Sequence, residues 1–113
     1  MNITANELNQ QVIELGTHRG GFLWRNNTGR RGNVSYGKVG SGDVIGMYHG
    51  YFVSIETKTE HDKASHLQEM FLQDVRQHGG FACFVWSLDD AIEFFDMIDK
   101  FESERNGAQV IPF

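Results

Sequence analysis

Three side chains near the middle of the chain have the types and spacing that could hydrolyse a phosphodiester bond. Glu56 and Lys58 stand two residues apart in Tyr51 to Lys58, a run that reads as a β-strand, so both should project from one face. The preceding run, Val44 to Tyr48, also reads as a strand. The two residues between them, His49-Gly50, form a short loop typical of a β-hairpin.

The register of this hairpin predicts that Asp43 lies directly opposite Glu56, provided that Tyr48 pairs with Tyr51. Facing residues have Cβ atoms about 4.5–5.5 Å apart, and two carboxylates at that separation need a proton or a cation between them. Oxygen ligands suit Mg²⁺ or Mn²⁺, and such an ion activates water and offsets phosphate charge. We therefore predict a metal site, with Lys58 orienting or deprotonating the water, or stabilising the developing charge.

A simpler interpretation gives these three residues no catalytic role. Asp43 follows Gly42 and could be a turn residue, and Glu56 and Lys58 could form a solvated strand face. Short motifs of this kind often match by chance. The pattern alone leaves both interpretations open.

The elements that must position these residues are predicted to form one α/β domain over 113 residues. Helices are expected at about 4–18, from 65 to before Gly79, and from 87 onward. Strands are expected at 22–27, about 34–36, 44–48, 51–58 and 81–86, the last with the apolar pattern of a central buried strand. The order αβ(β)ββαβα predicts a mixed β-sheet flanked by helices, with Trp24 and Trp86 in the core.

Charge is distributed unevenly along a chain whose formal net charge is -5. Between Leu15 and Gly42 there are five basic residues and no acid, whereas acids predominate from Asp89 to Arg105. A polyanion could contact the first segment and avoid the second. For any single residue a plain surface role is as good an interpretation, but as a group they favour a groove that reads the DNA backbone. The candidate contacts are Arg25, Asn26, Asn27, Arg30, Arg31, Lys38 and Lys63.

Five stretches, in one order along the chain, give it a wider resemblance that covers most of the chain from Glu7 to Phe94. They are FLWRNNTG (22–29), YGKVGSGDVIG (36–46), YFVSIETKT (51–59), ASHLQEMFLQDVRQHGG (64–80) and SLDDAIEF (87–94). The chain resembles the VRR-NUC family of PD-(D/E)XK nucleases, which implies a restriction-endonuclease-like core. The family's metal-binding Asp, second acid and catalytic Lys map to Asp43, Glu56 and Lys58. One departure is Gly42, where the family usually has Pro.

The resemblance also implies two further site residues, each with a structural alternative. The family's Gln on the following helix maps to Gln68, which could equally be the capping-box partner of Ser65. Related nucleases often supply a metal-binding Glu from the first helix. Glu7 matches that position better than Glu14, but Glu7 could instead be the capping-box partner of Thr4.

The function implied is a Mg²⁺- or Mn²⁺-dependent DNA endonuclease that cuts branched DNA such as Holliday junctions. Stand-alone chains of this size resemble phage or bacterial members, which implies a homodimer because a junction needs two cuts. The alternatives are a less selective nicking nuclease, a catalytically silent DNA-binding module, and an interaction domain without nucleic acid. A single cysteine, no apolar membrane-length run and no signal-like N-terminus predict the cytoplasm of a bacterial or phage-infected cell.

Overall fold

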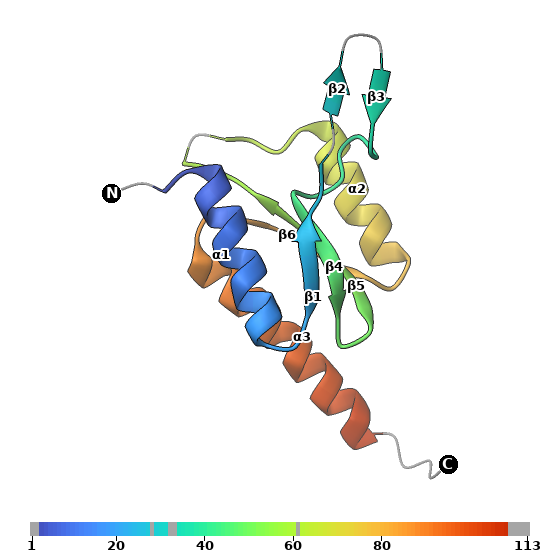
Figure 1. Cartoon of the computed structure of the whole chain (residues 1–113). Coiled ribbons are helices and arrows are strands. Elements are labelled where there is room, and N and C mark those ends of the chain that lie inside the picture. The colour runs from blue at the N-terminus through green and yellow to red at the C-terminus, as the bar shows by residue number, and fades with distance from the viewer. Residues whose placement is uncertain (1–2, 28, 32–33, 61, 109–113) are drawn as a thin grey trace.

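A computed structural model describes residues 3–27, 29–31, 34–60 and 62–108. It shows an α/β fold in which a four-stranded mixed sheet is flanked by helices (Figure 1). The helices are α1 (Ala5–His18), α2 (His66–Gln77) and α3 (Leu88–Ala108). The strands are β1 (Phe22–Arg25), β2 (Gly29–Arg31), β3 (Val34–Tyr36), β4 (Val44–Tyr48), β5 (Tyr51–Thr57) and β6 (Phe81–Val85).

The main sheet has the strand order β1-β4-β5-β6, so β5 lies inside it. Strand β4 pairs antiparallel with β1 and with β5, and β6 runs parallel to β5. His49 and Gly50 have φ values of 53° and 80°, the left-handed backbone that a tight two-residue hairpin loop requires. Tyr48 pairs with Tyr51 across this loop. The predicted hairpin and its register are therefore confirmed.

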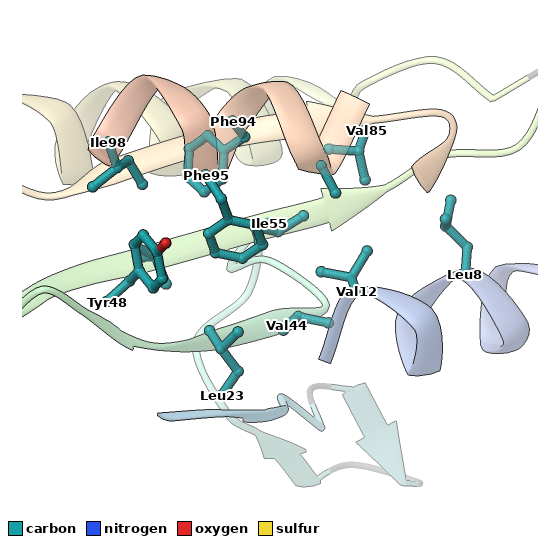
Figure 2. Close-up of a cluster of buried hydrophobic side chains, with 12 residues drawn as sticks. Leu8, Val12, Leu23, Val44, Tyr48, Ile55, Val85, Phe94, Phe95 and Ile98 are labelled. Atoms are coloured by element: carbon teal, nitrogen blue, oxygen red, sulfur yellow. The ribbon is translucent and has the colours of Figure 1, made fainter. Parts of the chain in front are cut away.

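The two faces of the sheet carry two separate apolar clusters. Helices α1 and α3 cover one face, and their side chains meet those of β1, β4, β5 and β6 in the larger cluster (Figure 2). Its members include Leu8, Val12, Leu23, Val44, Ile55, Val85, Phe95 and Ile98. Helix α2 covers part of the opposite face, where Leu72 and Val75 pack with Ala82. Because residues alternate along a strand, Glu56 lies on the α2 face when Ile55 lies in the larger core.

Strands β2 and β3 pair only with each other and form a separate antiparallel ribbon between β1 and β4. Figure 1 shows this ribbon standing off the end of the main sheet. One short strand was predicted here, at 34–36, and β2 was not. Its sequence, GRR, has no apolar alternation from which a strand could be recognised. The element order thus differs from the predicted one by a strand.

Strand β6 lies at the edge of the sheet, which corrects the prediction of a central strand from its apolar run. Two side chains bind its outer backbone groups. Arg76 donates from Nε and Nη2 to the carbonyl oxygen of Ala82, at 3.2 and 2.9 Å, and Asp90 accepts from the backbone N–H of Trp86 at 2.8 Å. The two tryptophans are also not in the core, since Trp24 is 42% exposed and Trp86 49%.

Candidate active site

Asp43 and Glu56 come together because the β4–β5 hairpin pairs Val44 with Ile55. Asp43 immediately precedes β4, so the same register carries it to the end of β5. Its carboxylate Oδ2 accepts hydrogen bonds from the backbone N–H of Thr57 at 2.9 Å and from the Thr57 hydroxyl at 3.0 Å. The aspartate is therefore fixed against the end of β5, next to Glu56.

Glu56 is a buried carboxyl group with one unsatisfied oxygen. Its side chain is on the α2 face and the residue is 9% exposed. Oε1 accepts a hydrogen bond from Gln68 Nε2 at 2.8 Å, while Oε2 is buried and accepts none from any residue the structure describes. Burial, and then the negative charge of Asp43, raise the pKa of Glu56 to about 8, against the opposing effect of Lys58. The neighbouring carboxyl groups of Glu56 and Asp43 therefore favour a proton or a cation between them.

Lys58 is a buried ammonium group held by acceptors on three sides. It is 6% exposed, and its Nζ donates to Gln68 Oε1 at 2.6 Å and to the Lys63 carbonyl oxygen at 3.3 Å. Glu56 Oε1 lies 3.9 Å from Nζ, and the Phe84 ring centroid lies 5.8 Å away. An ammonium has three N–H donors and these two hydrogen bonds use two of them. Counting only the described residues, one donor remains for a phosphate oxygen or a water molecule.

Gln68 completes a helix cap and also contacts Lys58 and Glu56. As the third residue of α2 it completes a capping box, in which Oε1 accepts from the Ser65 backbone N–H at 3.0 Å and its own N–H donates to Ser65 Oγ at 3.1 Å. The same amide accepts from Lys58 and donates to Glu56. The helix cap therefore fixes the amide, and the amide fixes the distance between the lysine and the glutamate.

Helix α1 contributes Asn9 to the site, a residue that the sequence analysis missed. Asn9 is 2% exposed, and its Oδ1 lies 2.6 Å from Thr57 Oγ1, the hydroxyl that also contacts Asp43. The hydroxyl donates to Asn9 Oδ1 and also lies 3.0 Å from Asp43 Oδ2, so its single proton is shared between two acceptors. The available signal was a polar residue beside Leu8 on the apolar face of the helix, because buried amides need partners.

Glu7 and Glu14, the alternatives considered on α1, are both exposed and bonded locally. Glu7 Oε1 accepts the Thr4 hydroxyl at 3.1 Å, and Glu14 Oε1 accepts from Gln10 Nε2 at 3.0 Å. Across residues 3–27, 29–31, 34–60 and 62–108, no group of three or more His, Cys, Asp or Glu side chains is placed to hold a metal ion. Glu7 thus occupies its capping position and does not form such a group with Asp43 and Glu56.

Two carboxylates nevertheless fit a magnesium ion. Mg²⁺ keeps several water ligands and is usually bound by one or two carboxylates together with substrate phosphates. Asp43 and Glu56 supply that number, and the unsatisfied Glu56 Oε2 is a hard oxygen donor of the preferred kind. These two residues are the ones that would hold Mg²⁺ or Mn²⁺.

The candidate DNA contacts flank the same end of the sheet, and those whose side chains the structure describes do not form one cluster of bonded side chains. Asn27, Lys38 and Lys63 are exposed, and Arg25 donates to Asn6 on α1. Arg30 and Arg31 lie in β2, where the structure describes the backbone alone. Asn26 Nδ2 donates to Ser41 Oγ at 2.7 Å and to the Gly42 carbonyl oxygen at 2.9 Å. It holds the loop that leads into Asp43.

Gly42 is packed too tightly for a proline. Its N–H donates to Ser54 Oγ at 3.2 Å, and a Cβ at this position would lie 2.4 Å from that oxygen and 3.0 Å from the backbone nitrogen of Ile55. Overpacking costs about 1–3 kcal/mol, and leaving a buried hydroxyl without its donor costs about 1–3 kcal/mol. Gly42, at the position where the VRR-NUC family usually has Pro, thus leaves space for the Ser54 side chain and donates a hydrogen bond to it.

We expect Gly42→Pro to lower the free energy of unfolding by roughly 2–5 kcal/mol, through overpacking together with the lost N–H. Gly42→Ala keeps the N–H and should cost less. Urea unfolding of both variants, with Gly42→Ala repeated in a Ser54→Ala background, measures the effect. A smaller cost in that background identifies Ser54 Oγ as the clashing atom, and equal costs in both backgrounds would contradict this explanation.

In comparisons with known proteins, the chain matches no family model and no characterised protein. The resemblance to VRR-NUC nucleases therefore stays a prediction, and the geometry around Glu56 is the basis for a function.

Proposed function

We propose that this protein is a metal-dependent DNA endonuclease with a restriction-endonuclease-like core of the VRR-NUC type. One observation carries the proposal: a buried glutamate with an unsatisfied oxygen lies between an aspartate and a buried lysine, and all three are fixed by hydrogen bonds. A solvated strand face would expose these groups. Burying charged groups is costly unless they are paired, hydrogen-bonded or bound to a ligand, and Glu56 Oε2 has no hydrogen-bond partner among the described residues.

The chain's own residues each have a definable part in hydrolysis. Mg²⁺, when bound, would lower the pKa of a water ligand and neutralise charge on the phosphate. Asp43 and Glu56 would hold it, with Thr57 and Asn9 fixing the aspartate. Lys58 has a donor left for the phosphate, where it would stabilise the charge that develops as water attacks phosphorus and the P–O bond breaks. Gln68 keeps this ammonium beside Glu56.

The charge distribution supports a nucleic acid as the substrate. Lys38, Lys63 and Asn27 are exposed around the end of the sheet where Asp43 and Lys58 lie, and the tandem arginines of β2 lie in the adjacent ribbon. Such contacts read the backbone and not the base sequence. We propose that the substrate is branched DNA, such as a Holliday junction. We further propose that a homodimer cuts it in the cytoplasm of a bacterial or phage-infected cell. No helix among the described residues is long and apolar enough to cross a membrane.

The test is cleavage of a labelled four-way junction and its matching linear duplex in Mg²⁺, Mn²⁺ or EDTA, by the wild type and by Asp43→Asn. We expect metal-dependent cutting that Asp43→Asn loses, and the junction-to-duplex ratio separates a resolvase from a general nicking enzyme. If the wild type binds DNA but cuts neither substrate, it is a silent binding module. If it shows no salt-dependent DNA binding, an interaction domain is the better interpretation.

A further inference from the structure

The side of the sheet that faces α2 carries large apolar side chains on β1, β4 and β5 that no described element covers. Leu23, Val44 and Tyr48 point into the core under α1 and α3, so their neighbours along each strand point to the α2 side. Helix α2 packs on β5 and β6, and none of the described helices packs on β1 or β4 from this side. The exposed fractions there are 70% for Phe22, 42% for Trp24, 40% for Met47 and 37% for Phe52.

The strand register joins these side chains into one patch. Met47 lies opposite Phe22 on one side and Phe52 on the other, and Trp24 lies opposite Ile45. The Phe22 and Trp24 rings have centroids 5.1 Å apart. Sheets that leave one face in water usually alternate apolar with polar residues, whereas strands covered on both faces read as continuous apolar runs. Strand β4, VIGMY, has the second pattern, so its sequence is that of a strand with both faces covered.

A hollow of about 520 Å³ lies on the same face, between α2 and the β4–β5 hairpin. Ile45, Phe52, Phe71 and Val75 give it an apolar lining. Its volume is within the range of about 300–1,000 Å³ that is typical of small-molecule sites, so it has room for an aromatic side chain. We call the exposed Phe22, Trp24 and Met47 the ridge. Because Ile45 pairs with Trp24 and also lines the hollow, the ridge and the hollow adjoin.

The patch fits a second copy of this chain. A two-fold dimer presents the same surface on both subunits, so each protruding part must match a recess on that surface, and the ridge and the hollow meet this condition. The ridge has no charged residue with which to bind a polyanion. Since a fully exposed aromatic side chain presents about 150–250 Å², the ridge and Phe52 expose roughly 300–400 Å² per copy. Two copies, with the lining of both hollows, would bury close to the roughly 1,200 Å² at which standard interfaces begin.

We propose that this chain forms a two-fold dimer in which the ridge of each copy packs into the hollow of the other. The inference rests on the proposed function for its homodimer and assigns the surface that this dimer uses. Asn26 and Ser41, which hold the loop before Asp43, line the hollow. The interface therefore lies beside the candidate active site of each copy. Its size, at the low end for specific interfaces, predicts a reversible dimer with a micromolar dissociation constant.

Sedimentation equilibrium of the metal-free protein, without DNA, tests the dimer. We expect the wild type to pass from monomer to dimer between about 1 and 100 µM, and Phe22→Ser to raise the dissociation constant about 10-fold or more. Met47→Ser and Met97→Ser are a matched pair, since the two methionines are 40% and 50% exposed but Met97 lies on α3. Only Met47→Ser should weaken the dimer. A wild type that stays monomeric at about 100 µM, or a Phe22→Ser dimer as stable as the wild type, would overturn the proposal.

Mixing two variants tests the pairing of ridge with hollow. Phe22→Ser alters the ridge and Phe52→Ser alters the hollow, so neither variant alone forms an unaltered ridge–hollow contact. A mixed dimer contains one such contact, and an equimolar mixture should therefore hold more dimer than either variant by itself. No gain on mixing would overturn this arrangement. Urea unfolding checks that both variants fold, and the wild-type measurement does not depend on them.

The two proposals can fail separately. If the dimer forms through this patch but no metal supports DNA cutting, the nuclease function fails and the interface stands. If the protein cuts DNA but the wild type stays monomeric, the interface fails and the nuclease function stands.

Discussion

Lys58→Met is expected to lower the single-turnover rate of DNA cleavage by about 100- to 1,000-fold, the usual cost of removing one charge-stabilising donor. Methionine keeps most of the apolar length of the buried lysine but not its ammonium. The donor that remains after the bonds to Gln68 and to the Lys63 carbonyl is then missing from the phosphate. The measurement is the cleavage rate of labelled junction DNA at saturating Mn²⁺, with affinity measured separately in EDTA.

Lys100→Met is the matched control for that experiment, because Lys100 lies on the exposed side of α3 and pairs only loosely with Glu104, at 4.0 Å. It should cut at the wild-type rate. DNA affinity of Lys58→Met should change little, since a buried ammonium contributes little to bulk phosphate attraction. Cutting by Lys58→Met at the wild-type rate would remove Lys58 from the reaction and with it the assignment to this class of nuclease.

The second large effect concerns stability and pH in the metal-free protein. The pKa of Glu56 is about 8 in the folded state against 4.5 for an ordinary glutamate. Between these values the folded state holds a proton that the unfolded state has released, so the free energy of unfolding falls as pH rises from about 4.5 to about 8. Since each pKa unit corresponds to about 1.4 kcal/mol, the loss is on the order of 5 kcal/mol.

Glu56→Gln should remove this loss, because glutamine stays neutral and its side-chain oxygen can still accept from Gln68. In EDTA the variant should be about as stable as the wild type at acid pH. At pH 9 it should be clearly more stable than the wild type. Urea unfolding from pH 5 to 9 measures both profiles, with the exposed Glu104→Gln as a control that should follow the wild type. Parallel profiles for wild type and Glu56→Gln would show that Glu56 is not the titrating group.

If Glu56 is a ligand, Mg²⁺ should make the wild type more stable than Glu56→Gln at pH 9, the reverse of the order in EDTA. An ion that binds only the folded state stabilises it in proportion to its occupancy, and a deprotonated Glu56 binds it better. Mg²⁺ should therefore raise the wild-type unfolding midpoint at pH 9 and leave that of Glu56→Gln nearly unchanged.

Local patterns in the sequence predicted the part of the site that lies on one hairpin and one helix cap. The loop His49-Gly50 sets the strand register and thereby places Asp43 by Glu56. The Ser65 capping box likewise places Gln68 from residues three apart. Both depend on interactions between neighbours in the chain, which is why two-residue periodicity and cap preferences were sufficient.

The rest of the site depends on how distant elements pack, which no local pattern encodes. Asn9 meets Thr57 across 48 residues only because α1 lies over the sheet face behind Asp43. The exposure of Trp86 follows from β6 being an edge strand, whereas its apolar run resembles that of a strand covered on both sides. Strand order and helix placement are tertiary properties, and an apolar run is compatible with either position.

The two side chains bound to the outer backbone of β6 also bear on how the protein behaves at high concentration. An edge strand with free N–H and C=O groups is a template for another chain, and natural sheets protect such edges. In β6 the outward-facing groups alternate through residues 82, 84 and 86; Arg76 occupies the first and Asp90 the last. A foreign strand would have to displace a guanidinium and a carboxylate to form a continuous ladder, so this edge resists aggregation without an added helix or loop.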